Sequence, residues 1–263
     1  MRLRLSQDAR PQAMTLLVAT AISLVLWFIP FAGILYYPFR LFVTFIHEGG
    51  HALAVVLTGN SVEYLWVATN AEGQVGSLTD GGLISRMFIS SAGYLGAMAF
   101  GALLLALIRK AVAARIVLLA SGIYIFALTM IFGFIKPLFS FNGLSGVPFT
   151  LLAGIAISIG LVLIAKFATA RVATFFVSFL AVQCVLNALF DLKTLFFLSS
   201  PFAPAVHTDA VNMASATGIP AILWAGIWIV LALVILWFVM RLYVAGRDRS
   251  FQPDLPFEET PPV

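Results

Sequence analysis

The segment FRLFVTFIHEGGHALAVVL, residues 39–57, places two histidines and a glutamate inside a strongly apolar run. In a helix, residues four apart lie on one face, so His47 and His51 can each offer an imidazole nitrogen to one Zn²⁺. Glu48 then lies near enough to take a proton from a water bound to that ion. The segment therefore predicts a membrane helix that carries a hydrolytic zinc site.

The same five-residue pattern occurs by chance in many proteins, and lone histidines are more often core residues than ligands. Here the chain has three histidines in total, and two of them fill the pattern. An acidic side chain near the centre of a bilayer costs about 2.5–3.5 kcal/mol on insertion scales, so it is rarely present without a function. These two points favour the metal site.

The composition is that of a polytopic membrane protein. Of 263 residues, 62% are hydrophobic and 10% are charged. The net charge of +4 comes from arginines and lysines in the tails and short loops, which suits a lipid bilayer as partner and gives no reason to expect nucleic acid. The single cysteine, Cys184, excludes a cysteine-based zinc site, so the ligands must be histidine and carboxylate.

Seven apolar stretches are long enough to cross a hydrocarbon core of about 30 Å. They cover approximately residues 13–30, 37–58, 86–108, 115–135, 147–165, 172–192 and 219–243. We therefore predict an all-α polytopic membrane protein with about seven transmembrane helices, within a range of six to eight. Gly93, Ala97 and Gly101 form a small-residue ridge on the third stretch, which predicts close helix packing there and no chemistry.

Two further segments have distinct predictions. Two short β-prone runs within residues 61–78, separated by a turn at residues 70–73, predict a small β-hairpin between the second and third spans. Residues 247–263 are rich in proline and acidic side chains and predict a disordered tail. The membrane domain is thus expected to cover residues 1–246.

A catalytic zinc usually takes three protein ligands and leaves a fourth position for water, so the sequence must supply one more ligand. A polar stripe on the late apolar helix is formed by Gln183, Asn187 and Asp191, and such stripes face the interior of a bundle. Asp191 is thus one candidate, unless it only pairs with Lys193 at the interface. Asp209, in a late loop, is the competing ligand, unless it is a solvated loop residue or a helix cap.

The chain resembles the site-2-protease-like intramembrane zinc metallopeptidases over roughly residues 39–230, and most of all their compact branch without a PDZ domain. The resemblance rests on four features: HEGGHAL at 47–53, the hairpin after Gly59, AGYLG at 92–96, and the late span with Asn187 and Asp191. It implies one Zn²⁺ held by His47, His51 and Asp191, with Glu48 as the base. The family's usual third-ligand motif also has a proline and a glycine, and neither is present around Asp191 here.

We therefore expect an intramembrane zinc endopeptidase, embedded as a multi-pass protein in the cell membrane. Its substrates would be membrane proteins or peptides, with Glu48 carrying the proton and Asn187 holding the substrate backbone or the oxyanion. The hairpin offers a strand with which an extended substrate can pair.

A non-catalytic membrane scaffold, or a metal or proton transporter that uses the same polar site, is the alternative. Glu48 argues against a scaffold, because two histidines suffice for passive metal binding. A transporter is expected to contain internal repeats, and the sequence has no second copy of the histidine motif.

Overall fold

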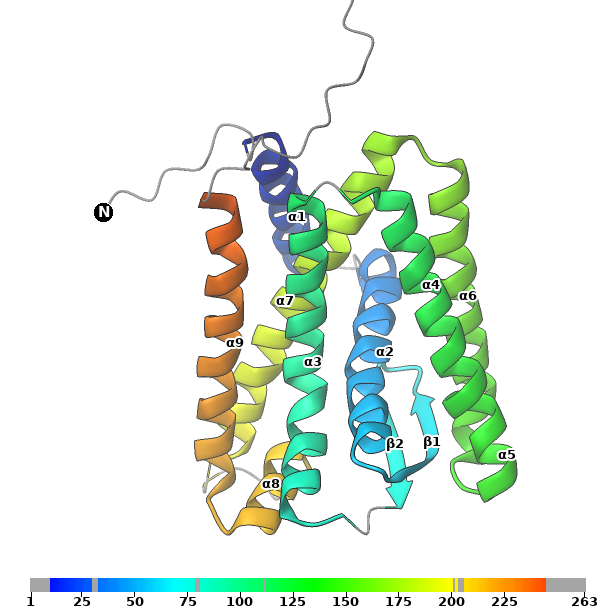
Figure 1. Ribbon diagram of the computed structural model, residues 1–263, viewed down its shortest axis with the longest axis vertical. Coiled ribbons are helices and arrows are strands. Elements are labelled where there is room, and N and C mark those ends of the chain that lie inside the picture. Colours follow the sequence, from blue (N-terminus) through cyan, green and yellow to red (C-terminus); the bar gives the residue numbers. More distant parts are fainter. Residues whose placement is uncertain are drawn as a thin grey trace, which may run out of the picture.

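The computed structural model describes residues 10–29, 33–78, 81–110, 112–200, 202 and 206–244. In this part of the chain a helical bundle encloses one small sheet near one end (Figure 1). The elements, in order, are α1 (Arg10–Phe28), α2 (Gly33–Leu57), β1 (Ser61–Val67), β2 (Gly73–Leu78), α3 (Leu83–Arg109), α4 (Ala114–Met130), the π-helical turn η2 (Ile131–Ile135), α5 (Lys136–Ser140), the 3₁₀ turn η3 (Leu144–Gly146), α6 (Val147–Phe167), α7 (Ala170–Leu198), α8 (Asp209–Thr217) and α9 (Ala221–Val244).

The structure confirms an all-α membrane bundle. Among the described residues, six helices are long and apolar enough to cross a bilayer: α2, α3, α4 continued through η2 and α5, η3 with α6, α7 and α9. The first predicted span is the helix α1, whose apolar part, Arg10–Leu26, is shorter. The count of long spans is thus at the lower end of the predicted range. The predicted boundary at residue 246 and the tail 247–263 lie outside the described residues.

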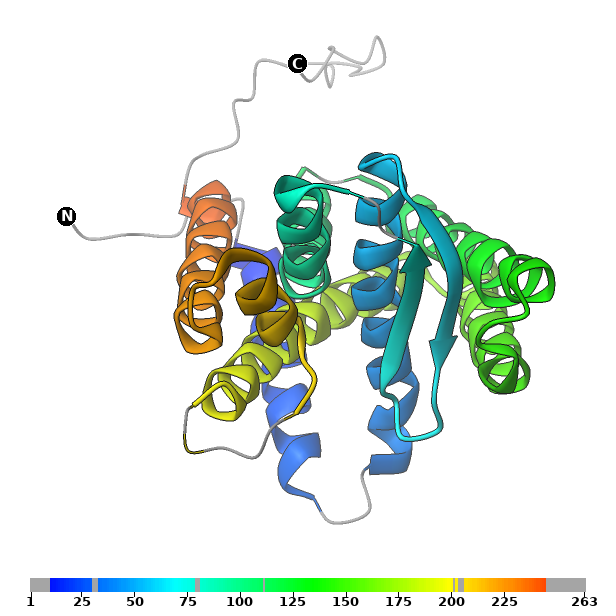
Figure 2. The same ribbon diagram turned by 90° about the horizontal axis from the view of Figure 1, so that it is seen from below.

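The hairpin is also confirmed, and one of its edges is covered. β1 and β2 pair antiparallel from Ser61 opposite Leu78 to Val67 opposite Gly73, with an irregularity between Val62 and Tyr64. On the far side of β1, the Val67 amide donates to Thr150 Oγ1 over 2.9 Å, and Ser140 Oγ donates to the Glu63 carbonyl over 3.1 Å. Side chains of α5 and α6 thus occupy the outer edge of β1, whereas β2 lies beside α2 (Figure 2).

The hairpin turn is tied to the helix that bears the histidine motif. Three successive carbonyls, those of residues 69–71, accept hydrogen bonds from Tyr37, Arg40 and Thr44 over 2.6, 3.3 and 2.7 Å. These three side chains lie on one side of α2, because their spacing is three and then four residues. The turn, and with it the start of β2, is therefore positioned by α2 itself.

The helices α2 and α3 approach each other through glycine. A Cβ atom on Gly50 would collide with the carbonyl oxygen of Ala92, and a Cβ on Gly96 would lie 3.4 Å from the Gly50 Cα. Small residues allow membrane helices to pack backbone to backbone in this way. The ridge predicted on α3 continues to Gly101, where a Cβ would lie 2.9 Å from Cys184 Cβ of α7. The packing role predicted for this ridge is therefore correct at Gly101.

A buried polar chain joins α1, α7 and α2. Gln183 is fully buried and donates to Ser23 Oγ over 3.0 Å. Asn187 Nδ2 lies 2.8 Å from the Gln183 carbonyl and 3.2 Å from its Oε1, and the Tyr36 hydroxyl donates to Asn187 Oδ1 over 2.6 Å. Gln183 and Asn187 of the polar stripe therefore face inward, as polar groups in a membrane bundle are expected to do.

We expect Gly50→Ala to destabilise the protein by about 1–3 kcal/mol, because the added methyl group meets a backbone carbonyl that cannot move without shifting α3. The matched control is Gly160→Ala on α6, where a Cβ has nothing within 4 Å. That control should be neutral or slightly stabilising, because alanine favours the helix. Thermal unfolding of both variants in the same detergent is the measurement, and equal midpoints would contradict the close contact.

Candidate metal centre

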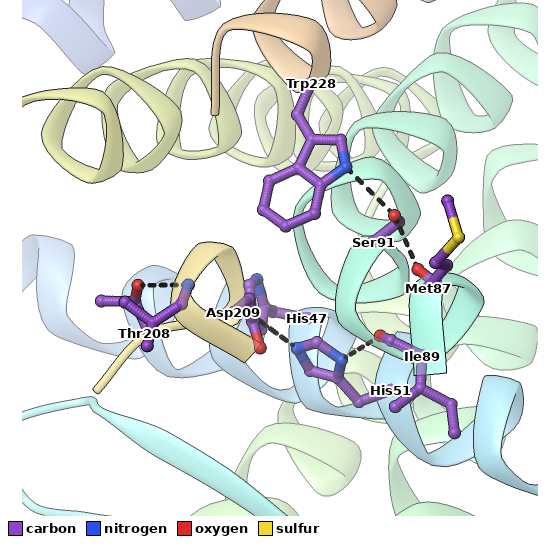
Figure 3. Close-up of polar contacts among 9 residues, drawn as sticks. His47, His51, Met87, Ile89, Ser91, Thr208, Asp209 and Trp228 are labelled. Carbon is purple, nitrogen blue, oxygen red and sulfur yellow. Dashed lines mark hydrogen bonds and ion pairs between the residues drawn. The ribbon is translucent and has the colours of Figure 1, made fainter. Parts of the chain in front are cut away.

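Two histidines from α2 and one aspartate from the start of α8 meet at one point in the described structure (Figure 3). His47 Nε2 and His51 Nε2 are 3.1 Å apart. Asp209 Oδ2 lies 3.2 Å from His51 Nε2 and 3.7 Å from His47 Nε2. One potential ligand atom from each residue thus lies within 4.8 Å of the other two.

These separations fit a tetrahedral metal ion. Zinc–nitrogen distances of about 2.0–2.1 Å in a tetrahedral site place neighbouring ligand atoms about 3.3–3.4 Å apart. The three distances of 3.1, 3.2 and 3.7 Å bracket that value. The donor set of two imidazoles and a carboxylate is also one that zinc takes in catalytic sites. The three residues therefore suit a catalytic metal that keeps one further position open.

The second ring nitrogen of His51 is held by the backbone. His51 Nδ1 lies 2.8 Å from the carbonyl oxygen of Ile89 on α3 (Figure 3). A carbonyl only accepts, so Nδ1 carries a proton in either charge state of the ring, and Nε2 is the nitrogen left to bind a metal. Space at this point depends on Gly93, because a Cβ there would collide with Nε2 of both histidines.

Asp209 is presented by the beginning of a helix. Thr208 is the N-cap of α8, and its Oγ1 accepts from the Val211 amide over 3.3 Å. Asp209 is then the first helical residue, where the helix dipole favours a negative charge. Burial raises the pKa of Asp209, but the charge of His51 and hydrogen bonds from His47 and His51 outweigh it and hold that pKa well below its usual value. Asp209 is thus ionised, as a metal ligand must be.

Glu48 is directed to the hairpin and not to the face shared by the histidines. It is 5% exposed, and a Cβ on Gly73 would lie 2.6 Å from Glu48 Oε1. Gly73 is the first residue of β2, so the carboxylate lies directly against the start of that strand. The base predicted from the motif therefore lies between the metal ligands and the hairpin.

Asp191, the ligand that the family resemblance implied, is not in the three-residue group, which contains its competitor Asp209. Asp191 lies at an exposed position on α7, on the wall of the same cavity that holds the histidines.

Asn187 lines the same cavity as the histidines, but its amide is engaged elsewhere. Its nitrogen bonds to Gln183, and its oxygen accepts from Tyr36. A donor to a substrate would have to break these contacts. The structure therefore places Asn187 at the site and gives its side chain a role in joining helices.

One cavity of about 880 Å³ contains all of these groups. Its wall on one side is β2, with Gly73, Gln74 and Ser77, and on the other side the end of α7 and the start of α8. The motif of α2 lines it between these walls. Among the charged side chains that line it are Arg40, Glu48, Glu72, Arg86, Asp191 and Asp209. The cavity is thus polar at a point where the surrounding helices are apolar.

Two groups at the centre were missed by the sequence analysis. Gly93 was interpreted as packing only, yet its missing side chain leaves the space in front of the histidines. Tyr94 was interpreted only as part of a family segment, yet its ring contacts His47 edge to face at a centroid distance of 4.6 Å. Only the proximity of α3 to α2 reveals both roles, whereas the Thr208–Asp209 pair carried a recognisable capping signal.

Comparison with known proteins gives one family match. A family model described as Peptidase M50B-like matches residues 15–239 of the chain. No curated protein and no solved structure matches it significantly. The matched range includes the motif helix, the hairpin, α7 and α8.

We expect Asp209→Ala to lose most of its bound metal, because it leaves only two ligands, whereas Asp191→Ala should keep a metal content near that of the parent. Metal analysis of the purified variants, after equilibration with a limiting concentration of Zn²⁺, is the measurement. A depleted Asp191→Ala beside a replete Asp209→Ala would assign the third ligand to Asp191 instead.

Proposed function

The chain belongs to the peptidase M50B-like family, and from this premise we propose that it is an intramembrane zinc-dependent endopeptidase of the cell membrane. Its substrates are membrane proteins or membrane-associated peptides. The observation that carries the proposal is the placement of Glu48 beside a His47–His51–Asp209 group in one polar cavity between membrane helices.

The proposed ligands of the single Zn²⁺ are His47, His51 and Asp209. When bound, the ion supplies a Lewis acid that polarises the scissile carbonyl and makes a water molecule more acidic. The contribution of the protein is to hold the ligands before substrate arrives. The Ile89 carbonyl orients His51, and the cap at Thr208 orients Asp209.

Glu48 acts as the proton carrier of the proposed reaction. Its carboxylate takes one proton from water while the water oxygen forms a bond to the carbonyl carbon and the carbonyl π electrons move to oxygen. When the carbon–nitrogen bond breaks, its electron pair stays on nitrogen, which takes the proton back from Glu48. One water is consumed for each peptide bond, and the products are a carboxylic acid and an amine, which become a carboxylate and an ammonium when the acid proton passes to the amine.

The hairpin is the proposed binding surface for the substrate. A helical substrate has its carbonyls occupied by intrahelical bonds, so the segment to be cut must be extended. The outer edge of β1 is occupied by Thr150 and Ser140, whereas β2 borders the cavity next to Glu48. A substrate strand added along β2 would therefore pass over the metal ligands.

A scaffold, or a metal or proton transporter, would use the same polar groups without hydrolysis. The position of Glu48 favours the peptidase, because its carboxylate lies beside the three-residue group and is not one of its members. That is the position a general base needs. The experiment on Glu48 below separates the two functions.

We expect Glu48→Gln to retain zinc and to lose cleavage of single-span model substrates by a factor of about 10³ or more, because glutamine cannot accept a proton. Zinc content and cleavage are measured on the same preparations. Cleavage equal to that of an active parent would exclude Glu48 as the base, whereas absence of cleavage by the parent as well would favour the transporter or scaffold.

If the substrate pairs with β2 as an added strand, turnover should depend on the backbone amides of the substrate in an alternating pattern. In a ladder, amides point alternately to the partner strand and away from it, so N-methylation of a cleaved peptide should slow turnover at every second position near the cut. The measurement is kcat/KM for a series of singly N-methylated, quenched-fluorescence peptides. Sensitivity confined to the scissile amide would argue against pairing with β2.

A further inference from the structure

The geometry points to Tyr94 as a further catalytic residue, and we propose that its hydroxyl donates a hydrogen bond to the oxyanion formed from the scissile carbonyl. This inference rests on the proposed hydrolysis and adds to it a residue that the histidine motif does not contain. Zinc is not the only group that stabilises the negative charge that develops on the carbonyl oxygen. Positioned hydrogen-bond donors also contribute strongly in a site with little water.

Tyr94 lies at the metal centre and not in the packing behind it. It follows Gly93 on α3, whose Cα faces Nε2 of both histidines. Its ring contacts the His47 ring edge to face, at 4.6 Å between centroids and an interplanar angle of 84°. It also lines the cavity that holds Glu48 and Asp209. A substrate carbonyl that reaches the metal position must therefore pass close to Tyr94.

A second aromatic contact restrains the ring of Tyr94. Trp228 of α9 is 1% exposed and lies 6.0 Å from Tyr94 between ring centroids, at 30°. The indole nitrogen of Trp228 donates to Ser91 Oγ over 3.0 Å, and Ser91 Oγ donates to the Met87 carbonyl over 2.9 Å (Figure 3). The Tyr94 ring thus contacts both His47 and an indole that is itself hydrogen-bonded. Such preorganisation lets a donor act without the cost of being oriented during the reaction.

The hydroxyl of Tyr94 is available as a donor. It lies close enough to Asp209, Asp191 and Glu48 to interact electrostatically with each of them. Among the described residues it makes no hydrogen bond. A phenol has an ordinary pKa of about 10, so it carries its proton at neutral pH and can donate it to a negatively charged oxygen.

Two other polar groups of the cavity are already engaged. The Asn187 amide nitrogen donates to the carbonyl and to Oε1 of Gln183, and Trp66 Nε1 donates to Gln74 Oε1 over 3.1 Å. Asn187, which the sequence suggested for holding the oxyanion, therefore has its donors directed into its own helix. Tyr94 differs from these groups in two respects. Its ring contacts His47, and no described residue forms a hydrogen bond with its hydroxyl.

The test is Tyr94→Phe in the full-length, zinc-loaded protein, because phenylalanine keeps the ring contacts and removes only the hydroxyl. We expect kcat on a cleaved model peptide to fall by about 10²-fold, which is the usual effect of removing one oxyanion donor, while KM stays within about threefold. Zinc content and thermal midpoint should match the parent. The control is Tyr124→Phe on α4, whose hydroxyl lies behind the motif helix near Gly49 and does not line the cavity.

A binding measurement gives a readout that is independent of turnover. A phosphinic peptide carries a tetrahedral, anionic group in place of the scissile carbonyl, so its affinity should fall at least about tenfold in Tyr94→Phe. Affinity for the matching product peptide should not change. Tyr124→Phe should alter neither affinity.

The outcomes separate this inference from the proposed function. A parent protein without Glu48-dependent cleavage overturns the hydrolysis and the role of Tyr94 together. An active parent with equal kcat and equal phosphinate affinity in Tyr94→Phe overturns only the role of Tyr94. Zinc loss in Tyr94→Phe, or equal weakening of phosphinate and product peptide, would show that the hydroxyl is structural and would likewise overturn it.

Discussion

The backbone contact between α2 and α3 is the constraint on which the rest of the site depends. Gly50 lies against Ala92, and Gly93 lies before the two histidines, so a larger residue at either position would separate the helices or fill the metal position. The same contact places the Ile89 carbonyl against His51 and the Tyr94 ring against His47. One close packing thus creates space for an ion, fixes an imidazole tautomer and positions a hydroxyl.

The two sides of the cavity are held by different kinds of interaction. On the hairpin side, side chains of α2 bind three carbonyls of the turn, which keeps Gly73 against Glu48. On the other side, a short capped helix presents Asp209. Local hydrogen bonds thus position each wall of the cavity, without a rigid loop on either side.

The two candidates for the third ligand show what the sequence of one helix leaves open. In the polar stripe, Gln183 is fully buried and bonded to Ser23, and Asn187 is half-buried and bonded to Tyr36, whereas Asp191 at its end is exposed. The spacing does not show where along α2 the stripe lies relative to His47, because that position depends on how α7 crosses α2. Asp209 is separated from the motif by about 160 residues of chain and comes beside it only through tertiary packing.

The sequence by itself determined the membrane class, the helix that bears His47, Glu48 and His51, and the hairpin after it. Those features depend on composition and on contacts between residues a few positions apart, and such local physics is visible in any window of the chain. Only the tertiary structure decided that Asp209 meets the histidines, that Gly93 leaves their space open, and that Tyr94 contacts His47. These relations join helices far apart in the chain, and they are set by crossing angles and relative heights that no single segment encodes.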